Sequence, residues 1–124
     1  MNKFKVQELG RNNKLKLSEC DKSLADVVHL IEKNLPPQLR LVVRGNYHSG
    51  HEDYSIYMEV KRTRWFSKPV FTFETAMDHD KRLYSKSFTH KIDDQQYAAT
   101  FMLLNRMIED KGFNISNKEW ESHQ

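Results

Sequence analysis

The sequence predicts an α+β domain in which two main helices pack on one face of a four-stranded antiparallel meander. Residues 38–91 alternate apolar and polar side chains with a period of two, as strands do. Apolar residues recur at three- and four-residue spacing in residues 18–35 and 93–111, as on one face of a helix. Turn-forming residues separate the period-two segments. The expected order of elements is therefore α-β-β-β-β-α.

The composition favours a single soluble domain. A chain of 124 residues can build one hydrophobic core but not two. No apolar run approaches the roughly 18 residues that a membrane span requires, and the first residues lack the apolar segment of a secretory signal. The one cysteine, Cys20, cannot form an internal disulfide, which suits a reducing compartment. We therefore expect a cytoplasmic protein without membrane contact.

Residues 1–17 predict a short β-hairpin or an arm. Phe4 and Val6 alternate with polar residues, and Gly10-Arg-Asn-Asn13 has the composition of a turn. A hairpin and an arm that orders only on a partner both fit this pattern. Ser18 or Asp21 would then cap the first helix, residues 18–35. Pro36 and Pro37 end that helix, because proline lacks the backbone N–H and disfavours helical geometry in the residue before it.

The sheet is expected within residues 38–91. Apolar residues of the second strand, Tyr54, Ile56, Met58 and Val60, share one face, which is typical of a sheet that is solvated on its other face. A meander places alternate connections at the same end of the sheet. The expected segments are a first strand from Leu39, a loop at 45–53, a second strand at 54–61, a corner at 63–69, a third strand around 71–74, a turn at 77–82 and a fourth strand at 84–91.

The last main helix, residues 93–111, is expected to be buried across the sheet. Asp93 or Asp94 would cap it, and Gly112 would end it. Its broad apolar stripe consists of Tyr97, Ala98, Phe101, Met102, Leu103, Leu104, Met107 and Ile108. Residues 112–124 form a tail, in which Ser116–Glu119 resembles a capping box that would start a short turn at 119–123.

The charge is unevenly distributed. The net charge of +3 is small, but residues 38–91 hold ten basic and six acidic residues, and residues 1–17 carry a net charge of +4. Residues 18–37 and 92–124 are net acidic, at −2 and −3. The predicted sheet and N-terminal segment are therefore basic and the helices acidic.

The first candidate site is the corner at 61–68 together with the open face of the sheet. Residues 61–68 contain four cations and no acid, with two aromatic residues between them. Arginine pairs with phosphate, and an aromatic ring can stack on an unpaired base. The candidate residues for binding nucleic acid or another partner are Arg40, Arg44, Tyr57, Lys61, Arg62, Arg64, Trp65, Phe66 and Lys68. In the alternative, Trp65 and Phe66 fill the edge of the core, and the cations only protect edge strands.

A second candidate site lies in the loops at the opposite end of the meander. Imidazoles and carboxylates there are the ligands that zinc or manganese would need. The residues concerned are His48, His51, Asp53, Asp78, His79 and Asp80, with Glu52 beside them. Their spacing matches no metal-binding motif, and such residues are common in turns for backbone reasons. We therefore expect no cofactor.

Three function classes remain. The favoured hypothesis is a small non-catalytic protein that recognises nucleic acid or a protein–nucleic-acid machine through its basic, aromatic sheet face, because no catalytic motif is present. The alternatives are a protein-interaction or oligomerisation module and a small metal-dependent hydrolase. In general type the chain is similar to accessory proteins of phages and mobile elements, including nuclease inhibitors such as anti-CRISPR proteins. That resemblance assigns no residues.

Overall fold

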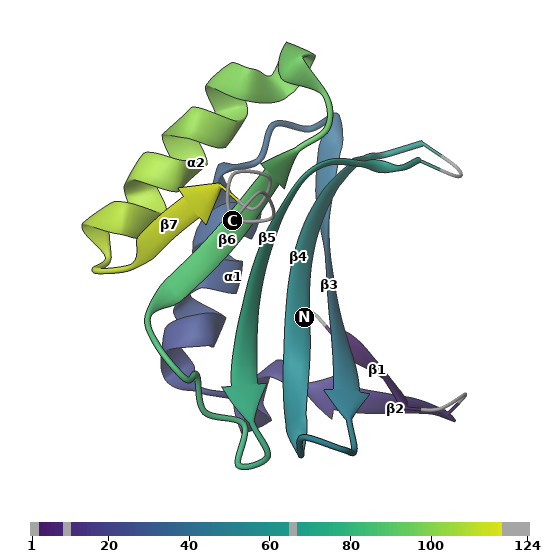
Figure 1. The fold of residues 1–124 in the computed structure, drawn as a ribbon. Helices are drawn as coiled ribbons and strands as arrows, with labels where there is room; N and C mark the ends of the chain where they lie inside the picture. Colours follow the sequence, from purple (N-terminus) through teal and green to yellow (C-terminus); the bar gives the residue numbers. More distant parts are fainter. Residues whose placement is uncertain (1–2, 9–10, 65–66, 118–124) are drawn as a thin grey trace.

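Seven strands form one sheet, covered by two helices, in residues 3–8, 11–64 and 67–117, the parts of the chain that the computed structural model describes. Both helices lie on the same side of the sheet (Figure 1). The predicted α+β class with a mostly antiparallel sheet is confirmed. The elements are β1 (Lys3–Glu8), β2 (Arg11–Lys16), η1 (Leu17–Glu19), α1 (Lys22–Asn34), β3 (Leu39–His48), β4 (Asp53–Arg62), β5 (Pro69–Asp78), β6 (Ser87–Ile92), η2 (Gln95–Tyr97), α2 (Ala98–Asp110) and β7 (Asn114–Asn117).

The predicted meander is the middle of a larger sheet. Strands β3 to β6 are neighbours in sequence order, and each pairs antiparallel with the next. The predicted N-terminal hairpin is present as β1 and β2, and β1 joins the meander by pairing parallel to β3. At the other edge, β7 pairs parallel to β6. The sheet order is therefore β2-β1-β3-β4-β5-β6-β7 rather than the four strands expected from the sequence.

The first hairpin of the meander is longer than predicted. A loop was expected from Gly45, but β3 continues to His48. Gly45 is buried and has strand partners on both sides, opposite Val6 of β1 and Ile56 of β4, so a residue that weakens an isolated strand is held here by two neighbours. The connection therefore shrinks to residues 49–52, with Glu52 at a φ of 54°.

The connection between β5 and β6 is longer than predicted. The fourth strand was expected from residue 84 but begins at Ser87. Its ladder with β5 runs from Ile92 to Thr89. Beyond Thr89 the two segments are joined by a bridge between Met77 and Leu83 and by the Thr75 hydroxyl, which donates to the Ser87 carbonyl at 2.9 Å. Tyr84 lies within this connection. The two strands thus separate before they reach the turn.

Both helices begin after the predicted first residues, 18 and 93, and each follows a short turn, although one of the two predicted caps is used at each start. The N-cap of α1 is Asp21, whose carboxylate accepts a hydrogen bond from the Ser23 N–H at 3.0 Å, and residues 17–19 form the separate turn η1. The helix ends before Pro36, as expected. Asp94 caps η2 by accepting from the Gln96 N–H at 3.0 Å, and α2 follows. Gly112, at a φ of 97°, follows α2 and turns the chain toward β7.

Strand β7 was not predicted, because residues 112–124 were interpreted as a tail. The Phe113 ring packs on Phe88 with centroids 4.9 Å apart, and the Asn114 N–H donates to the Lys86 carbonyl at 2.9 Å. These contacts hold the segment against β6. The turn expected at 119–123 lies outside the described residues.

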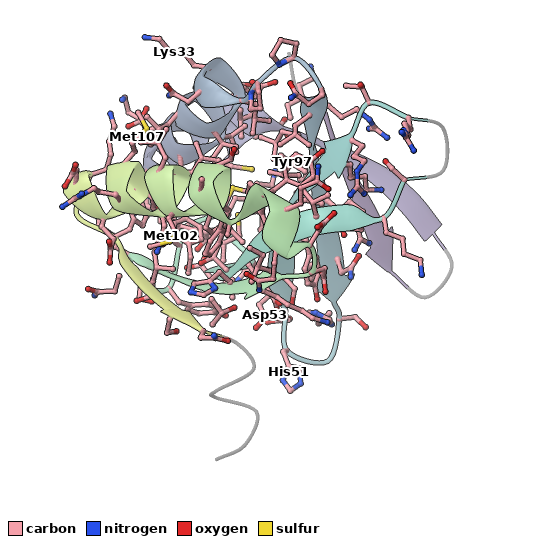
Figure 2. The ribbon with its side chains drawn as sticks, turned by 90° about the horizontal axis from the view of Figure 1, so that it is seen from above. Lys33, His51, Asp53, Tyr97, Met102 and Met107 are labelled. Carbon is pink, nitrogen blue, oxygen red and sulfur yellow. The ribbon has the colours of Figure 1, made fainter. Side chains whose placement is uncertain are left out.

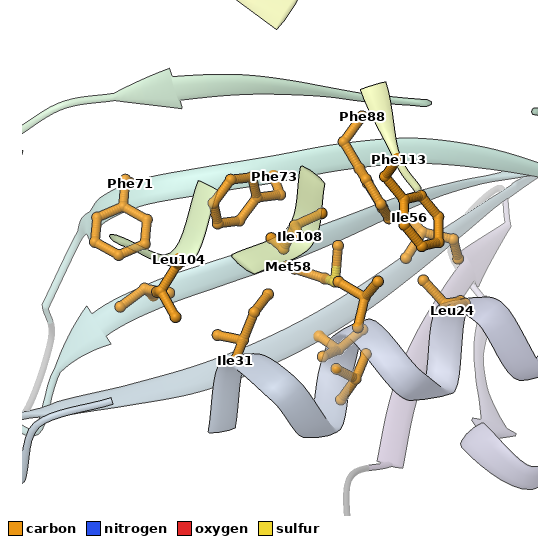
Figure 3. Packing of buried hydrophobic residues seen from close by; sticks show 14 of the residues in the cluster. Leu24, Ile31, Ile56, Met58, Phe71, Phe73, Phe88, Leu104, Ile108 and Phe113 are labelled. Atoms are coloured by element: carbon orange, nitrogen blue, oxygen red, sulfur yellow. The ribbon is translucent and has the colours of Figure 1, made fainter. Parts of the chain in front are cut away.

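The core lies between the sheet and the two helices (Figure 3). At its centre the Phe101 ring of α2 lies 5.3 Å from the Phe71 ring and 5.6 Å from the Phe73 ring. The stripe on α2 is narrower than predicted, because Met102 and Leu103 are 66% and 55% exposed. No helix in the described ranges is long and apolar enough to span a membrane. Fully buried side chains come from every layer, including Leu24, Ile31, Ile56, Met58, Phe88, Leu104 and Ile108.

Candidate functional site

The face of the sheet opposite the helices carries polar side chains in register. Ile56, Met58 and Val60 of β4 are buried in the core, and residues between them point to this open face, as predicted. Residues that pair across strands share a face. Pairing places Arg44, Tyr57, Glu74 and Thr89 in one row, Val42, Glu59, Thr72 and Lys91 in the next, and Arg40 opposite Lys61 beyond them.

Glu59 neutralises much of the positive charge in the middle of the open face. Its carboxylate accepts two hydrogen bonds from the Arg44 guanidinium, at 3.1 Å and 2.9 Å, and lies 3.8 Å from the Lys61 ammonium. The Arg44 guanidinium also lies over the Tyr57 ring, 5.1 Å from its centroid. Arg44, Lys61 and Tyr57 are thus brought together as expected, but as an internally paired cluster.

A pocket of about 390 Å³ opens where β6 separates from β5, and we call it the hydroxyl pocket. The carboxylate-bearing Glu74 lines it with Ala76 and Phe88. A second pocket of about 230 Å³ shares Glu74 and Thr89 with it, so the two adjoin on the open face. Seven of the ten residues that line the hydroxyl pocket carry hydroxyl groups: Ser55, Thr75, Tyr84, Ser85, Ser87, Thr89 and Ser116.

A third pocket, of about 400 Å³, lies at the predicted corner, and we call it the corner pocket. Its lining residues are strongly polar: Gln38, Arg62, Thr63, Arg64, Gln96 and Tyr97. Residues from three separate segments meet here because the Thr63 N–H donates to the Gln38 carbonyl at 3.0 Å. The guanidinium of Arg62 also bonds the carboxylate of Asp94, next to the start of η2. The corner therefore lies beside the residue that follows Pro36-Pro37 and beside the start of the last helical region.

Arg62 and Arg64 differ in their surroundings, although the sequence treats them alike. The Arg62 guanidinium pairs with Asp94 and lies over the Tyr97 ring, 5.3 Å from its centroid. Arg64 is exposed, as are Arg40 and Lys68. Among the residues that the structure describes, these three cations form no ion pair. Trp65 and Phe66 lie outside the described residues.

The histidine and carboxylate loops meet at one end of the sheet, as the meander predicted, but they do not form a ligand cluster. No three or more His, Cys, Asp or Glu side chains within the described ranges are arranged to hold a metal ion. His51 extends away from the body of the protein (Figure 2). The exposed His79 imidazole lies 3.6 Å from the Asp80 carboxylate. His48 contacts the Ser55 hydroxyl at 2.8 Å. The Asp78 carboxylate instead accepts N–H hydrogen bonds within its own turn, at 2.8 Å and 3.1 Å.

Cys20 and His90 are not arranged for catalysis or ligand binding. Burial raises the pKa of the Cys20 thiol to about 11, so it is protonated near neutral pH and is a poor nucleophile. His90 faces the core and not the open face, with its ring 4.8 Å from the Phe101 ring. Its position argues for packing rather than ligand binding.

Comparison of the chain with protein-family models, curated proteins and solved structures found no match.

Sequence reasoning missed two contributions to these surfaces. Gln38, Gln96 and Tyr97 line the corner pocket, yet none stands out in the sequence, because each adjoins a helix or strand boundary. The signal was indirect: the meander placed their segments at the same end as the corner. No local pattern in the sequence indicates the hydroxyl pocket, since its serines and threonines are spread from residue 55 to residue 116.

Proposed function

We propose that the protein is a non-catalytic binding protein for single-stranded nucleic acid. The observation that supports this most directly is the corner pocket, where two guanidinium groups, two side-chain amides, a hydroxyl and a tyrosine ring converge. Three exposed cations are nearby: Arg40 lies at the start of β3, and Arg64 and Lys68 lie in the connection between β4 and β5. A pocket of this composition offers both phosphate contacts and base contacts.

The chemistry favours a single strand over a duplex. Side-chain amides of glutamine can pair with the edges of bases, and these edges are accessible when the bases are unpaired and splayed out. An arginine guanidinium pairs with phosphate through parallel N–H donors, and Tyr97 supplies a ring on which a base can stack. Gln38 and Gln96 reach the pocket from two separate segments, before β3 and within η2. A single strand of nucleic acid could therefore be bound through its phosphate backbone and through one base.

The distribution of paired charges indicates where phosphates would bind. Glu59 already occupies Arg44 and lies near Lys61, and the Lys91 ammonium lies 3.5 Å from Asp93. These cations have carboxylate partners, so they attract phosphate less strongly than unpaired ones. Arg64 and Lys68 have no such partner among the described residues and are the preferred phosphate contacts.

The test is a fluorescence-anisotropy titration of a labelled single-stranded oligonucleotide across a range of salt concentrations. Native protein should bind with an affinity that falls steeply with salt, because bound phosphates release counterions. Replacing Arg64 with glutamine should weaken binding and reduce the slope of log K against log salt by about 0.7, the value for one phosphate contact on a single strand. The matched control is Arg106→Gln, which removes the same charge from an exposed position on α2.

Absence of salt-dependent binding by the native protein would contradict the proposal. An equal loss in Arg64→Gln and Arg106→Gln would also contradict the corner location, because only net charge would then matter. Arg62 is unsuitable as a probe, since its guanidinium is bonded to Asp94 and its replacement would also remove that ion pair.

A second candidate function is protein binding through α2. Met102 and Leu103 project 66% and 55% of their surface to solvent, which is unusual for large apolar side chains next to each other. The hypothesis of a nuclease inhibitor would combine this face with the basic corner. Affinity capture from a host lysate, with and without nuclease treatment, separates the two functions: a partner retained after nuclease treatment would favour protein binding.

A further inference from the structure

We infer that the hydroxyl pocket recognises ribose through its 2′-hydroxyl, so that the nucleic acid bound at the open face is RNA. This inference rests on the proposed function and adds the class of ligand to it. The pocket is a site separate from the corner, formed by the gap between β5 and β6. The chemical composition of the pocket, rather than its volume, favours a ribose.

The pocket can both donate and accept hydrogen bonds over a small area. Each hydroxyl has one donor and two acceptor positions, and a carboxylate accepts hydrogen bonds at both of its oxygens. The hydroxyls of Thr75 and Tyr84 donate to the Ser87 carbonyl and the Asp53 carboxylate, and the Ser55 hydroxyl contacts His48, so these three offer their remaining positions. Glu74 and Thr89 are opposite one another in the sheet and lie on the open face. The 2′-hydroxyl of ribose is likewise both donor and acceptor, and it distinguishes RNA from DNA at a protein site. The pocket is thus complementary to a ribose hydroxyl.

The pocket is poorly suited to phosphate. None of the described residues that line it is lysine or arginine, and the Glu74 carboxylate is among them, so these residues offer a phosphate group no opposite charge. Ala76 and Phe88 provide an apolar part of the lining, against which the carbon side of a sugar ring can pack. Tyr84, 58% exposed, lines the pocket within the β5–β6 connection, where its ring can stack against a base or sugar. An uncharged, hydroxylated ring therefore fits better than a phosphate group.

A nucleic-acid strand that is bound at the corner can reach the hydroxyl pocket. Along β4, Ser55 lines the hydroxyl pocket and Arg62 lines the corner pocket. Seven residues of strand span about 23 Å at roughly 3.3 Å per residue. The second pocket, lined by Arg44 and Tyr57, continues the hydroxyl pocket along the open face, whereas Arg62 pairs with the buried Leu39 and lies on the helix side of the sheet. The exposed Arg64, which also lines the corner pocket, follows the end of β4. A short oligonucleotide on the open face can therefore extend from the hydroxyl pocket across the second pocket toward Arg64.

The experiment compares three oligonucleotides of about ten nucleotides with the same base: oligouridylate, oligodeoxyuridylate and 2′-fluoro-oligouridylate. The fluoro analogue keeps the sugar conformation of RNA but cannot donate a hydrogen bond. Native protein should bind oligouridylate about tenfold more tightly than either analogue, the factor expected for one hydrogen bond to a carboxylate.

Two variants test whether the preference for RNA arises in the hydroxyl pocket. Glu74→Gln removes a negative charge from the binding face, so it should strengthen binding of all three oligonucleotides while reducing the preference for RNA to about twofold or less. Thr89→Val removes one pocket hydroxyl at constant shape and should also reduce the preference. The matched control is Thr72→Val on the same face of β5, which lines only the neighbouring pocket and should leave the preference unchanged.

Equal binding of RNA and DNA would overturn this inference and leave the proposed function standing. A preference for RNA that persists in both Glu74→Gln and Thr89→Val would also overturn it, since the discrimination would then come from elsewhere. Failure to bind any of the oligonucleotides would overturn the proposed function and this inference together.

Discussion

The carboxylate of Asp21 accepts a hydrogen bond from the backbone N–H of Leu83 at 3.0 Å, although the two residues are 62 positions apart. The other carboxylate oxygen caps α1 by accepting from the Ser23 N–H. The backbone N–H of Asp21 in turn donates to the Lys81 carbonyl at 2.9 Å. One residue thus joins the start of α1 to the long connection between β5 and β6, which forms a wall of the hydroxyl pocket.

Replacing Asp21 with alanine should reduce the free energy of unfolding by about 2–3 kcal/mol, because a helix cap and a second hydrogen bond to a carboxylate are both lost. Urea denaturation near neutral pH measures the change. The control is Asp26→Ala, whose carboxylate only pairs with the exposed Lys22 one turn earlier, and it should cost about 0.5 kcal/mol or less. Similar losses in the two variants would contradict the joining role of Asp21.

The hydrogen bonds of the Asp21 carboxylate should also affect the stability of the protein in acid. Burial acts to raise the pKa of Asp21, but the Leu83 and Ser23 N–H donors outweigh it and hold the pKa below its usual 3.8. A carboxyl group whose pKa is depressed in the folded state stabilises the protein above its unfolded pKa. That stabilisation disappears as the pH falls through the lower, folded pKa. Asp21→Asn should therefore show a smaller loss of stability in strong acid than the native protein.

The neighbouring leucines of α2 should respond very differently to truncation. Leu104 is fully buried between the sheet and α1, whereas Leu103 is 55% exposed. Leu104→Ala should reduce the free energy of unfolding by about 2–5 kcal/mol, and Leu103→Ala by less than about 1 kcal/mol. Chemical denaturation of the two variants gives the comparison. A large loss on truncating Leu103 would mean that this face is covered in the native protein, for example by a second copy.

Stability should decrease below about pH 6.5 because of His90. Burial lowers the pKa of this histidine below its usual 6.5, and its Nδ1 has no hydrogen-bond partner among the described residues. The unfolded chain therefore takes up a proton at a higher pH than the folded protein, so the free energy of unfolding falls as the pH falls through the window below 6.5. His90→Leu should remove this part of the pH dependence, measured by urea denaturation between about pH 5 and pH 8. The exposed His51→Gln is the control, and an unchanged pH profile in His90→Leu would contradict the argument.

The central sheet and the first helix were predictable because local patterns and tertiary structure agree there. The period-two apolar face of β4 is the buried face, and Pro36 and Pro37 follow the end of α1. The late start of α1 was less predictable, since both Ser18 and Asp21 are good caps. Only the contact with Leu83, distant in sequence, distinguishes the two.

The full length of β3, strand β7 and the difference between Arg62 and Arg64 depend on contacts with residues that are distant in the sequence. A local sequence pattern does not contain those contacts. Gly45 remains in β3 because strands flank it on both sides, and residues 114–117 form a strand because Phe113 packs on Phe88. Similarly, the sequence assigned Arg62 and Arg64 to the same binding corner. Asp94, contributed by the start of the last helical region, distinguishes them. The role of Trp65 and Phe66, binding or packing, stays a prediction.

The parallel strands β1 and β7 have a consequence for the order of folding. Each hairpin of the β3–β6 meander joins strands that are consecutive in the sequence. In contrast, β1 meets β3 through pairs such as Lys5 with Arg44, and β7 reaches β6 only after α2 has crossed the sheet. Closing longer loops costs more chain entropy before any contact repays it. The meander should therefore assemble first, with the outer edges of β3 and β6 transiently open to strands of other chains. Aggregation during refolding, rather than of the folded protein, is where this architecture is most vulnerable.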